Sequence, residues 1–472
     1  MIADLKPYAD YKDSGLPWLG QMPGHWETQR SKYLFCETDQ RSVAGTEQRL
    51  SMSQRHGLIR SSQLEERRLV SESSVGGKLC EAGDLVLNRL KAHLGVLAVS
   101  PMHGVVSPDY TVLRPIGTTN HHYFCAVYRS PHCGQELRRR AKGIVEGFWR
   151  LYTDDFYDIR VPVPPPDEQA AIVRFLDWAG GRLERTVRAK RKVIALLMEQ
   201  QQAVIQRAVT RGLDASVRLK LSGIPWLGNI PEHWEVRPLK AVSVLQSGIT
   251  LGKDYGSQQT REFPYLRVAN VQAGFVNLSV VKKIRVPAAE ARRSTLAVGD
   301  VLMTEGGDPD KLGRGCVWDG QVSPCLHQNH VFAVRPDQRR LESKFLSAFM
   351  GTNCAKAYFQ STAKQTTNLA STNKTKIGRL QVPLPPIDEQ RAILAAVAAE
   401  TQPASAAIAR LETEIKLLRE YRIRLVAEIV TGKLDVRDAA ARLPDAVSVD
   451  RPEDSGDDSG DTELANEEAA EA

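Results

Sequence analysis

Several polar side chains lie close together in the first half of the chain. The tract NRLKAHLG at 88–95 contains Asn88, Arg89, Lys91 and His93. Asparagine and arginine form paired hydrogen bonds with adenine and guanine, and lysine suits guanine or phosphate. The tract EGFWRLYTDDF at 146–156 adds Arg150, whereas its aromatic residues suit a protein core. The side chains of both tracts have the chemistry of contacts with bases or phosphates; the alternative for the first is an ordinary solvated turn after the strand-like run GDLVL.

Three tracts of the second half carry similar side chains. TEGGDPDKLGRG at 304–315 is rich in glycine, which lets a backbone approach a ligand closely. Within it, Lys311 and Arg314 suit phosphate or base, and Glu305 can accept a hydrogen bond from cytosine. The alternative is a flexible surface loop. The other candidates are Arg267 and Asn270 in YLRVANVQ (265–272), and Gln365, Thr366 and Asn368 in QTTNLAS (365–371).

The histidines and cysteines do not show the spacing of a metal site. His121, His122, Cys125, His132 and Cys133 lack the paired spacing of a structural zinc site. Their segment, HHYFCAVYRS, resembles SKFLSAFMGT at 343–352, which contains no such ligands. We therefore predict a helix with a buried cysteine and no metal. The seven cysteines of the chain are irregularly spaced, as is typical of reduced thiols in the cytoplasm.

The folded part of the chain is more basic than the net charge suggests. The formal net charge is +7, but the segment 445–472 carries eleven acidic residues and one basic residue. Residues 1–444 therefore carry +17, which favours a polyanionic partner such as nucleic acid. The N-terminus lacks the apolar core of a secretory signal, and no apolar run approaches the ~20 residues that cross a bilayer. We expect a cytoplasmic protein without membrane contact.

The chain lacks the common motifs of nucleic-acid enzymes. It contains no Walker A loop for ATP, no Asn-Pro-Pro-aromatic tract of amino-methyltransferases and no glycine fingerprint for S-adenosylmethionine. It also lacks a nuclease cluster of carboxylates and lysine. These absences disfavour an autonomous restriction enzyme. We predict no catalytic residue and no cofactor bound by this chain.

One unit is written twice along the chain. SGLPWLGQMPGHWE at 14–27 returns as SGIPWLGNIPEHWE at 222–235, and VPVPPPDEQAAI at 161–172 returns as VPLPPIDEQRAI at 382–393. TRGLD at 210–214 returns as TGKLD at 431–435. Between these landmarks only scraps align, namely GDLVL (83–87) with GDVLM (299–303) and LRP (113–115) with VRP (334–336). Chance similarity does not keep three landmarks in order at nearly fixed spacing.

Each copy ends in a long helix with apolar residues at heptad spacing. Asp167-Glu168 and Asp388-Glu389 suit the helix N-termini. The seam comprises Leu183, Val187, Ile194, Leu197, Val204 and Ala208 in the first copy, and Ile408, Leu411, Ile415, Leu418, Leu425 and Ile429 in the second. We expect Gly180-Gly181 and Pro403 to interrupt the helices. A narrow seam needs a partner helix, and two-fold symmetry would make the two copies antiparallel; the alternative is that each helix packs on its own globule.

The repeat also predicts how the chain closes. The segment 222–235 follows the first helix directly, so the same symmetry places residues 14–27 beside residues 431–435. Trp18 and Trp26 are then expected to pack there. A disordered N-terminal arm is the alternative. From Leu183 to Thr210 the first helix would be about 42 Å long at ~1.5 Å per residue, which exceeds one turn of B-DNA at ~34 Å.

The predicted fold class is α+β with a pseudo-two-fold internal repeat: two globular domains separated by two long antiparallel coiled-coil helices. Strand-like runs such as VLAVS (96–100), YTVLRP (110–115) and HVFAVRP (330–336) occur without a βαβ rhythm. The expected divisions are an entry segment at 1–26, a first globule at 27–165, a helix at 166–213, a repeated entry at 214–234, a second globule at 235–386, a helix at 387–435 and an acidic, disordered tail at 436–472.

The duplicated PWLG…P.HW entry and the duplicated VP.PP..EQ..I hinge resemble the specificity subunits of type I restriction-modification systems. The tracts YLRVANVQ, TEGGDPDKLGRG and QTTNLASTNKTKIG (365–378) share this resemblance, which extends to about Asp435. The resemblance implies two target-recognition domains, each reading one half of an asymmetric bipartite DNA site, and two helices that set their spacing.

The resemblance also implies partners. Two methyltransferase subunits would dock on the helices, and motor-nuclease subunits would complete a restriction endonuclease and adenine-specific DNA methyltransferase that serves phage defence. S-adenosylmethionine, ATP and Mg²⁺ are then expected on the partner subunits, and this chain is non-catalytic. A non-enzymatic coiled-coil adaptor that binds DNA outside a restriction system is the alternative.

Overall fold

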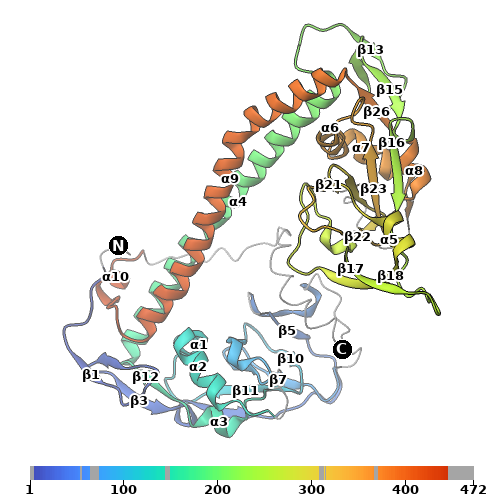
Figure 1. Ribbon diagram of the computed structural model, residues 1–472. Helices are drawn as coiled ribbons and strands as arrows, with labels where there is room; N and C mark the ends of the chain where they lie inside the picture. The colour runs from blue at the N-terminus through green and yellow to red at the C-terminus, as the bar shows by residue number, and fades with distance from the viewer. Residues whose placement is uncertain are drawn as a thin grey trace. The chain divides into compact units, whose positions relative to one another are not determined.

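A computed structural model describes residues 5–53, 56–63, 74–143, 149–307, 313, 315–365 and 370–444. The chain forms two compact units, one comprising residues 1–190 and 413–472 and the other residues 191–412. Each unit contains one globule and one end of a pair of long helices (Figure 1). Four predicted site residues, Lys311, Arg314, Thr366 and Asn368, lie outside the described residues, as does the part of the predicted tail from residue 445. The boundary of the predicted disordered tail at 436 was wrong, because residues 436–444 include a short helix and pack against the core of the first unit.

The two long helices are α4 (Pro166–Arg211) and α9 (Ile387–Val430). Both begin at the proline-rich hinge, with the predicted acidic pairs in the first turn. The expectation that Gly180-Gly181 and Pro403 interrupt the helices is wrong, because each helix runs through these positions. A glycine costs only about 1 kcal/mol in a helix, and packing against a partner helix supplies most of a helix's stability.

Both helices end at the repeated TRGLD/TGKLD landmark. Gly212 and Gly432 have positive φ angles of 76° and 75°, a conformation that glycine adopts without a steric penalty. The Gly212 amide donates to the Ala208 carbonyl at 3.0 Å, and the Lys433 amide donates to the Glu428 carbonyl at 2.8 Å. These bonds satisfy carbonyl groups that the last helical turn leaves open.

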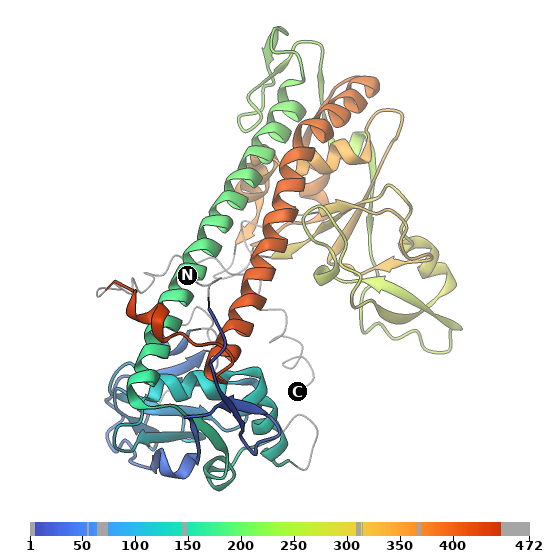
Figure 2. The ribbon, with the colours of Figure 1, turned by 90° about the vertical axis from the view of Figure 1, so that its left-hand side faces the viewer.

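The helices pair antiparallel within each unit. In the first unit, Glu184 of α4 pairs with Arg422 of α9 at 3.5 Å, and Lys190 pairs with Glu414 at 2.5 Å. In the second unit, the Gln201 side chain donates to the Thr401 carbonyl at 3.0 Å and to the Ser405 hydroxyl at 2.8 Å. As residue numbers increase along α4, those of the contacting residues on α9 decrease. The predicted antiparallel pairing is therefore confirmed (Figure 2).

The apolar seam lies between the helices. Seam residues from both units are at most 8% exposed: Val187, Ala208, Ile415, Leu425 and Ile429. The remaining seam residues are partly buried. Gln201 and Arg422, which occupy equivalent positions in the two copies, both make polar contacts across the seam. The same internal symmetry relates their partners, Ser405 and Glu184.

The first globule is built on a four-stranded antiparallel sheet. Its order is β4 (Phe35–Thr38), β11 (Tyr110–Pro115), β8 (Leu85–Asn88) and β9 (Leu97–Val99). Two helices, α1 (His121–Arg129) and α2 (Pro131–Arg140), bury Tyr123, Phe124 and Leu137 in the core that also holds Leu85 and Leu113 of the sheet. The helix N-caps are Asn120 and Ser130, whose side chains accept hydrogen bonds from the first backbone amides.

The other elements of the first unit are short. They are β1 (Tyr11–Asp13), β2 (Gln21–Pro23), β3 (Glu27–Arg30), η2 (Ser31–Tyr33), β5 (Leu50–Ser53), β6 (Gly57–Arg60), η3 (Ser61–Gln63), β7 (Lys78–Cys80), η4 (Ala92–Leu94), β10 (Gly104–Val106), α3 (Thr153–Tyr157), β12 (Arg160–Val163) and α10 (Arg437–Ala441). Strands β3 and β12 pair antiparallel and join the entry segment to the hinge before α4.

The second globule repeats this plan. Its sheet has the order β16 (Ser243–Ser247), β23 (Val331–Pro336), β19 (Val301–Thr304) and β21 (Gly315–Val317), with α6 (Ser343–Met350) and α7 (Asn353–Thr362) beside it. The other elements are β13 (Leu219–Leu221), β14 (Asn229–Pro231), β15 (Glu235–Pro238), η5 (Leu239–Ala241), β17 (Thr260–Leu266), η6 (Val268–Asn270), β18 (Lys282–Pro287), α5 (Ala288–Ser294), β20 (Gly306–Gly307), β22 (Leu326–His327), β24 (Lys364–Gln365), β25 (Ala370–Ser371), α8 (Lys374–Arg379) and β26 (Gln381–Leu384).

A buried carboxylate explains the two scraps of sequence that align between the globules. Asp84 follows Gly83 in the first scrap, and Arg114 of the second binds both of its oxygens at 3.2 Å. In the second globule, Arg335 binds both oxygens of Asp300 at 2.7 and 2.8 Å. These bonds raise the pKa of both arginines. The aligned scraps therefore preserve one bidentate ion pair in each sheet.

The duplicated HW and DEQ motifs meet at the start of each long helix. Trp26 donates its indole N–H to Glu168 at 3.0 Å, and His25 Nε2 lies 2.8 Å from the same carboxylate. Trp234 and His233 contact Glu389 at the same two distances. Trp26 and Trp234 are both fully buried. The motifs thus lock each entry segment onto a helix N-terminus.

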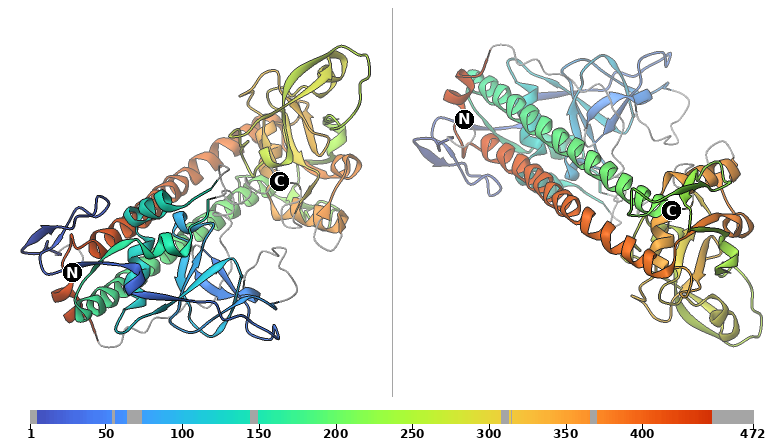
Figure 3. Two further views of the ribbon diagram at one scale, coloured as in Figure 1. Left: turned by 90° about the horizontal axis from the view of Figure 1, so that it is seen from below. Right: turned by 90° about the horizontal axis from the view of Figure 1, so that it is seen from above.

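The N-terminal segment lies beside the end of α9 (Figure 3). Lys6 forms a β-bridge with Asp435, and the Tyr11 hydroxyl lies 3.3 Å from the Lys433 carbonyl. Trp26 belongs to the same buried core as Ile429 and Val430, and Trp18 packs against that core. The described part of the entry segment is therefore an ordered part of the first unit.

One helix meets the length and hydropathy of a membrane span. An 18-residue window of α9 reaches a mean hydropathy of 1.3, so the sequence expectation of no such run was too strict. The region is rich in alanine and contains Glu400 and Pro403. Within the second unit, Glu400 lies 3.6 Å from Arg207 of α4. Of the apolar residues of this stretch, Ile393 is buried in the core of the second globule, and Leu394 and Val397 pack against that core.

Candidate nucleic-acid interface

The first group of candidates lies where β8 ends. Asn88 is the last residue of β8 and pairs with Tyr110 of β11. The carbonyl of the next residue, Arg89, accepts from the Leu151 amide at 3.0 Å, and Arg150 forms a β-bridge with Lys142. The structure therefore brings Asn88, Arg89 and Arg150 together. We call the segments 88–94, 109–111, 138–142 and 149–152 the first surface.

The side chains of the first surface differ in their freedom to contact a ligand. Asn88 accepts from the amides of Leu90 and Lys91 and shapes its own turn. Arg89 is tied to Thr111 at 2.7 Å and to Glu37 at 3.1 Å. Arg150 pairs with Asp109 at 3.2 Å at an exposed position. Lys91 is exposed, and His93 lies in η4 with no description of its side chain.

Sequence reasoning missed a basic helix end on the first surface. Helix α2 packs against η4 and ends in Arg138, Arg139 and Arg140. The Arg138 guanidinium lies 4.9 Å from the ring centre of Trp149, while Arg139 and Arg140 both bind Glu136. The run RRRAK was the available signal, since basic residues at a helix C-terminus also suit the helix dipole.

The second group of candidates lies where the three predicted tracts of the second globule meet. Tyr265-Leu266 of β17 pairs in parallel with Leu326-His327 of β22. The Glu305 amide donates to the His330 carbonyl at 2.9 Å, and the Thr372 amide donates to the Glu305 carbonyl at 2.8 Å. We call the segments 267–275, 304–307, 328–330 and 370–372, with Gln365 of the adjoining β24, the second surface.

Asn270 has a structural role on the second surface. It is 3% exposed, and its side chain accepts from the Arg267 amide and donates to the carbonyls of Asn277 and Val280 at 2.8–2.9 Å. Reading a base would break these bonds. Arg267 is half-buried, and its Nε has no hydrogen-bond partner in the described part of the chain. An unpartnered donor at this place suits a ligand that supplies the acceptor.

Glu305 is the carboxylate among the predicted residues of the second surface. It lies 2.5 Å from Nδ1 of His330, which the sequence analysis did not single out. The His330 side chain is 53% exposed and the Glu305 side chain 30%. Gln365 lies in β24, and its side chain is not described. A carboxylate beside an imidazole offers both an acceptor and a donor to a base edge.

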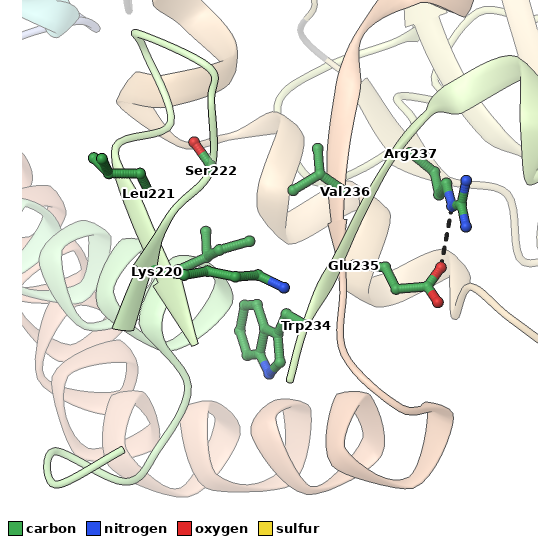
Figure 4. A pocket seen from close by; sticks show the side chains of 8 residues that line it. Lys220, Leu221, Ser222, Trp234, Glu235, Val236 and Arg237 are labelled. Atoms are coloured by element: carbon green, nitrogen blue, oxygen red, sulfur yellow. Dashed lines mark hydrogen bonds and ion pairs between the residues drawn. The ribbon is translucent and has the colours of Figure 1, made fainter. Parts of the chain in front are cut away.

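The repeated entry of the second unit borders a hollow of about 320 Å³ (Figure 4). Lys220, Leu221 and Ser222 line one side, with Trp234 below them and Arg237 beyond. Arg237 pairs with Glu235 at 3.1 Å, as the dashed line shows. No set of polar groups converges on a ligand among these lining residues, so this hollow belongs to the packing of the entry segment.

The histidine and cysteine segment forms ordinary helices. Cys133 of α2 is fully buried, and burial raises the pKa of its thiol. Within the ranges that the structure describes, no three His, Cys, Asp or Glu residues are grouped to hold a metal ion. The predicted helix is present as α1, but its cysteine, Cys125, is only half-buried; the fully buried cysteine is Cys133 of α2.

Comparisons with known proteins agree with this geometry. The chain is 26% identical over 172 residues to the putative type I restriction enzyme MjaX specificity subunit of Methanocaldococcus jannaschii, covering 35% of this chain and 39% of the relative. It is 23% identical over 240 residues to the type I restriction enzyme EcoKI specificity subunit of Escherichia coli K12, covering 50% of this chain and 49% of the relative. The resemblance is confirmed.

These matches span half or less of the relatives' lengths, and no family model matches the chain. A solved structure provides the wider likeness. A chain from a study of complex assembly and conformational transition in the type I restriction-modification system superposes with a TM-score of 0.60 at 16% identity, covering 88% of this chain and 99% of that chain. The predicted α+β fold with two long helices is shared with that chain.

Proposed function

We propose that this chain is the DNA-specificity subunit of a type I restriction-modification complex. Each globule reads one half of an asymmetric, bipartite site, the first through the first surface and the second through the second surface. The observation that carries the proposal is the repetition of one sheet order and one ion pair between a buried aspartate and an arginine, in two globules whose exposed tracts differ. Two globules that share one fold but carry different contact residues suit two different half-sites.

The basic character of the chain supports a DNA partner. Residues 1–444 carry +17, and the exposed side chains of the first surface include Lys91 and Arg139. Basic residues release counterions from phosphates, so binding should weaken steeply as salt rises. We propose contact with DNA for the predicted residues Arg89, Lys91, His93, Arg150, Arg267, Glu305, Lys311, Arg314, Gln365, Thr366 and Asn368. For Asn88 and Asn270 the proposal is support of the reading surface.

The catalytic groups of such a complex would lie on other subunits. We propose that two methyltransferase subunits dock along the long helices and carry S-adenosylmethionine, and that motor-nuclease subunits carry ATP and Mg²⁺. The chain itself acts without a catalytic residue, in the cytoplasm. An exposed apolar side chain such as Leu196 or Leu417 on the helices suits a protein partner.

Methylation-sensitive sequencing of the host genome tests this proposal. A strain that lacks the chain should lose methylation at one bipartite motif. Exchange of residues 27–160 for those of a relative should alter one half of that motif and preserve the other. An unchanged methylation pattern in the deleted strain would reject the proposal and favour an adaptor outside a restriction system.

A further inference from the structure

Another hollow, lined by two arginines, lies on the ribbon of β3 and β12, outside the first surface. Its volume is about 430 Å³, and Thr28, Gln29, Arg30, Tyr33 and Arg160 line it. Every one of these side chains can donate a hydrogen bond. Tyr33 is 56% exposed, and the Lys32 ammonium lies 4.9 Å from the centre of its ring. The hollow is therefore open, aromatic on one side and rich in donors.

Two arginines face each other across this ribbon. Arg30 of β3 and Arg160 of β12 are direct cross-strand partners, and both are exposed. Like charges at directly opposite positions destabilise a sheet. Arg30 lies 3.6 Å from Asp158, a distance that gives only a weak exposed ion pair. The Arg160 side chain makes no hydrogen bond or ion pair within the described ranges. The pair is thus left with an excess of positive charge.

The second copy of the repeat shows that the ribbon does not need this pair. The equivalent cross-strand partners on β15 and β26 are Pro238 and Gln381, which carry no charge. The nearest arginine of that ribbon, Arg237, is neutralised by Glu235. Both ribbons form the same four-residue antiparallel ladder. The two arginines are therefore an addition to the first copy and not a requirement of its fold.

The hollow also adjoins the first surface. Tyr33 belongs to η2, which packs against α3, and α3 begins three residues after Arg150. A five-residue helix is about 7.5 Å long, a length that spans only a few nucleotides at about 3.4 Å each. Nucleic acid that extends from the first surface along α3 would pass close to the hollow. Arginine pairs suit the oxygens of a phosphate group, which they bind with two hydrogen bonds.

We propose that Arg30 and Arg160 bind a backbone phosphodiester of DNA next to the half-site that the first globule reads. This inference rests on the proposed function and adds a sequence-independent contact to it. The phosphate would relieve the repulsion of the two guanidinium groups. Tyr33, Gln29 and Thr28 would supply further donors to its oxygens.

The test uses the full chain, its binding to a fluorescent duplex being measured by anisotropy between 50 and 200 mM NaCl. The R30Q/R160Q variant should bind several-fold more weakly at 100 mM NaCl, with the slope of log K against log salt reduced by about one. Base preference should stay the same, because phosphate contacts carry no direct sequence information. The matched control, R237Q, removes an arginine from the equivalent ribbon of the second copy and should bind as the unmodified chain does.

Stability separates a binding role from a structural one. Since the variant removes a repulsive pair, its melting temperature should equal or exceed that of the unmodified chain, and R30K/R160K, which keeps both charges, should retain most of the salt slope. If R30Q/R160Q bound the duplex as tightly as the unmodified chain, or if R237Q lost as much affinity as R30Q/R160Q, this inference would be overturned and the proposed function would stand. Loss of folding in R30Q/R160Q would also overturn it. Failure of the unmodified chain to bind any duplex, both alone and with methyltransferase subunits, would overturn the proposed function as well.

Discussion

The hydroxyl of Tyr8 lies 2.6 Å from Oε1 of Glu168. This contact joins the N-terminal segment to the first turn of α4, and no described residue makes an equivalent contact with Glu389. The Glu168 side chain is 4% exposed, whereas that of Glu389 is 29% exposed. Burial, followed by the bond to Glu168, raises the pKa of Tyr8. The contacts between the entry segment and the long helix are therefore more numerous and more buried at Glu168 than at Glu389.

The difference in burial between Glu168 and Glu389 predicts that the two carboxylates contribute unequally to the free energy of unfolding. Glu168→Gln should destabilise the first unit by about 2 kcal/mol, because buried donors lose a charged acceptor. The matched change Glu389→Gln should cost less, since water reaches that carboxylate. Thermal unfolding and hydrogen exchange of residues 5–30 would measure both. A larger loss in Glu389→Gln would contradict this account.

The ion pairs between a buried aspartate and an arginine predict coupling within each globule. Arg114→Gln leaves Asp84 buried with an unbalanced charge and should cost about 3 kcal/mol. The double change Asp84→Asn with Arg114→Gln should cost less than the sum of the single changes. Asp300 and Arg335 provide the same cycle in the second globule. Additive losses in both cycles would contradict this account, because they would show that the aspartate and the arginine of each pair contribute to stability independently.

The cysteines predict a simple pattern of reactivity. Burial raises the pKa of Cys316 to about 11 and that of Cys325 to about 12. The thiolate is the reactive form, so both residues should resist a disulfide reagent at pH 8, well below these values. Cys36 is exposed and should react fast. Cys36→Ser should remove the fast phase; rapid reaction of Cys316 in the folded chain would contradict its burial.

Sequence patterns predicted the scaffold of this protein better than its reading surfaces. The repeat and the heptad seam depend on local spacing, and they located the antiparallel helices. The strand order depends on pairing between distant segments, such as β4 with β11, which no local pattern contains. Side-chain type alone also suggested Asn270 as a base contact, although its amide satisfies three backbone groups. His330 was not predicted, because the sequence does not show that its side chain lies exposed beside Glu305.

The second surface predicts a change of specificity at one base. Glu305→Gln should alter the preferred base at one position of one half-site, with discrimination changing by about 1–3 kcal/mol. The other half-site should be unaffected. Selection from a randomised bipartite duplex would measure both. The control Glu290→Gln removes a carboxylate that pairs with Lys253 elsewhere in the second globule, and it should leave the preference intact.

The long helices predict that spacing can be changed without changing the bases that are read. Insertion of one heptad into α4 between Val187 and Leu197, matched by one in α9 between Ile408 and Leu418, keeps the apolar seam in phase. It lengthens each helix by about 10 Å, so the preferred spacer between half-sites should grow by about three base pairs while both half-sites stay the same. Insertion of three residues in each helix is the control, because it turns the seam away from the partner and should lower the melting temperature. A spacer that does not change after the heptad insertion would mean that the globules, and not the helices, determine the geometry of the site.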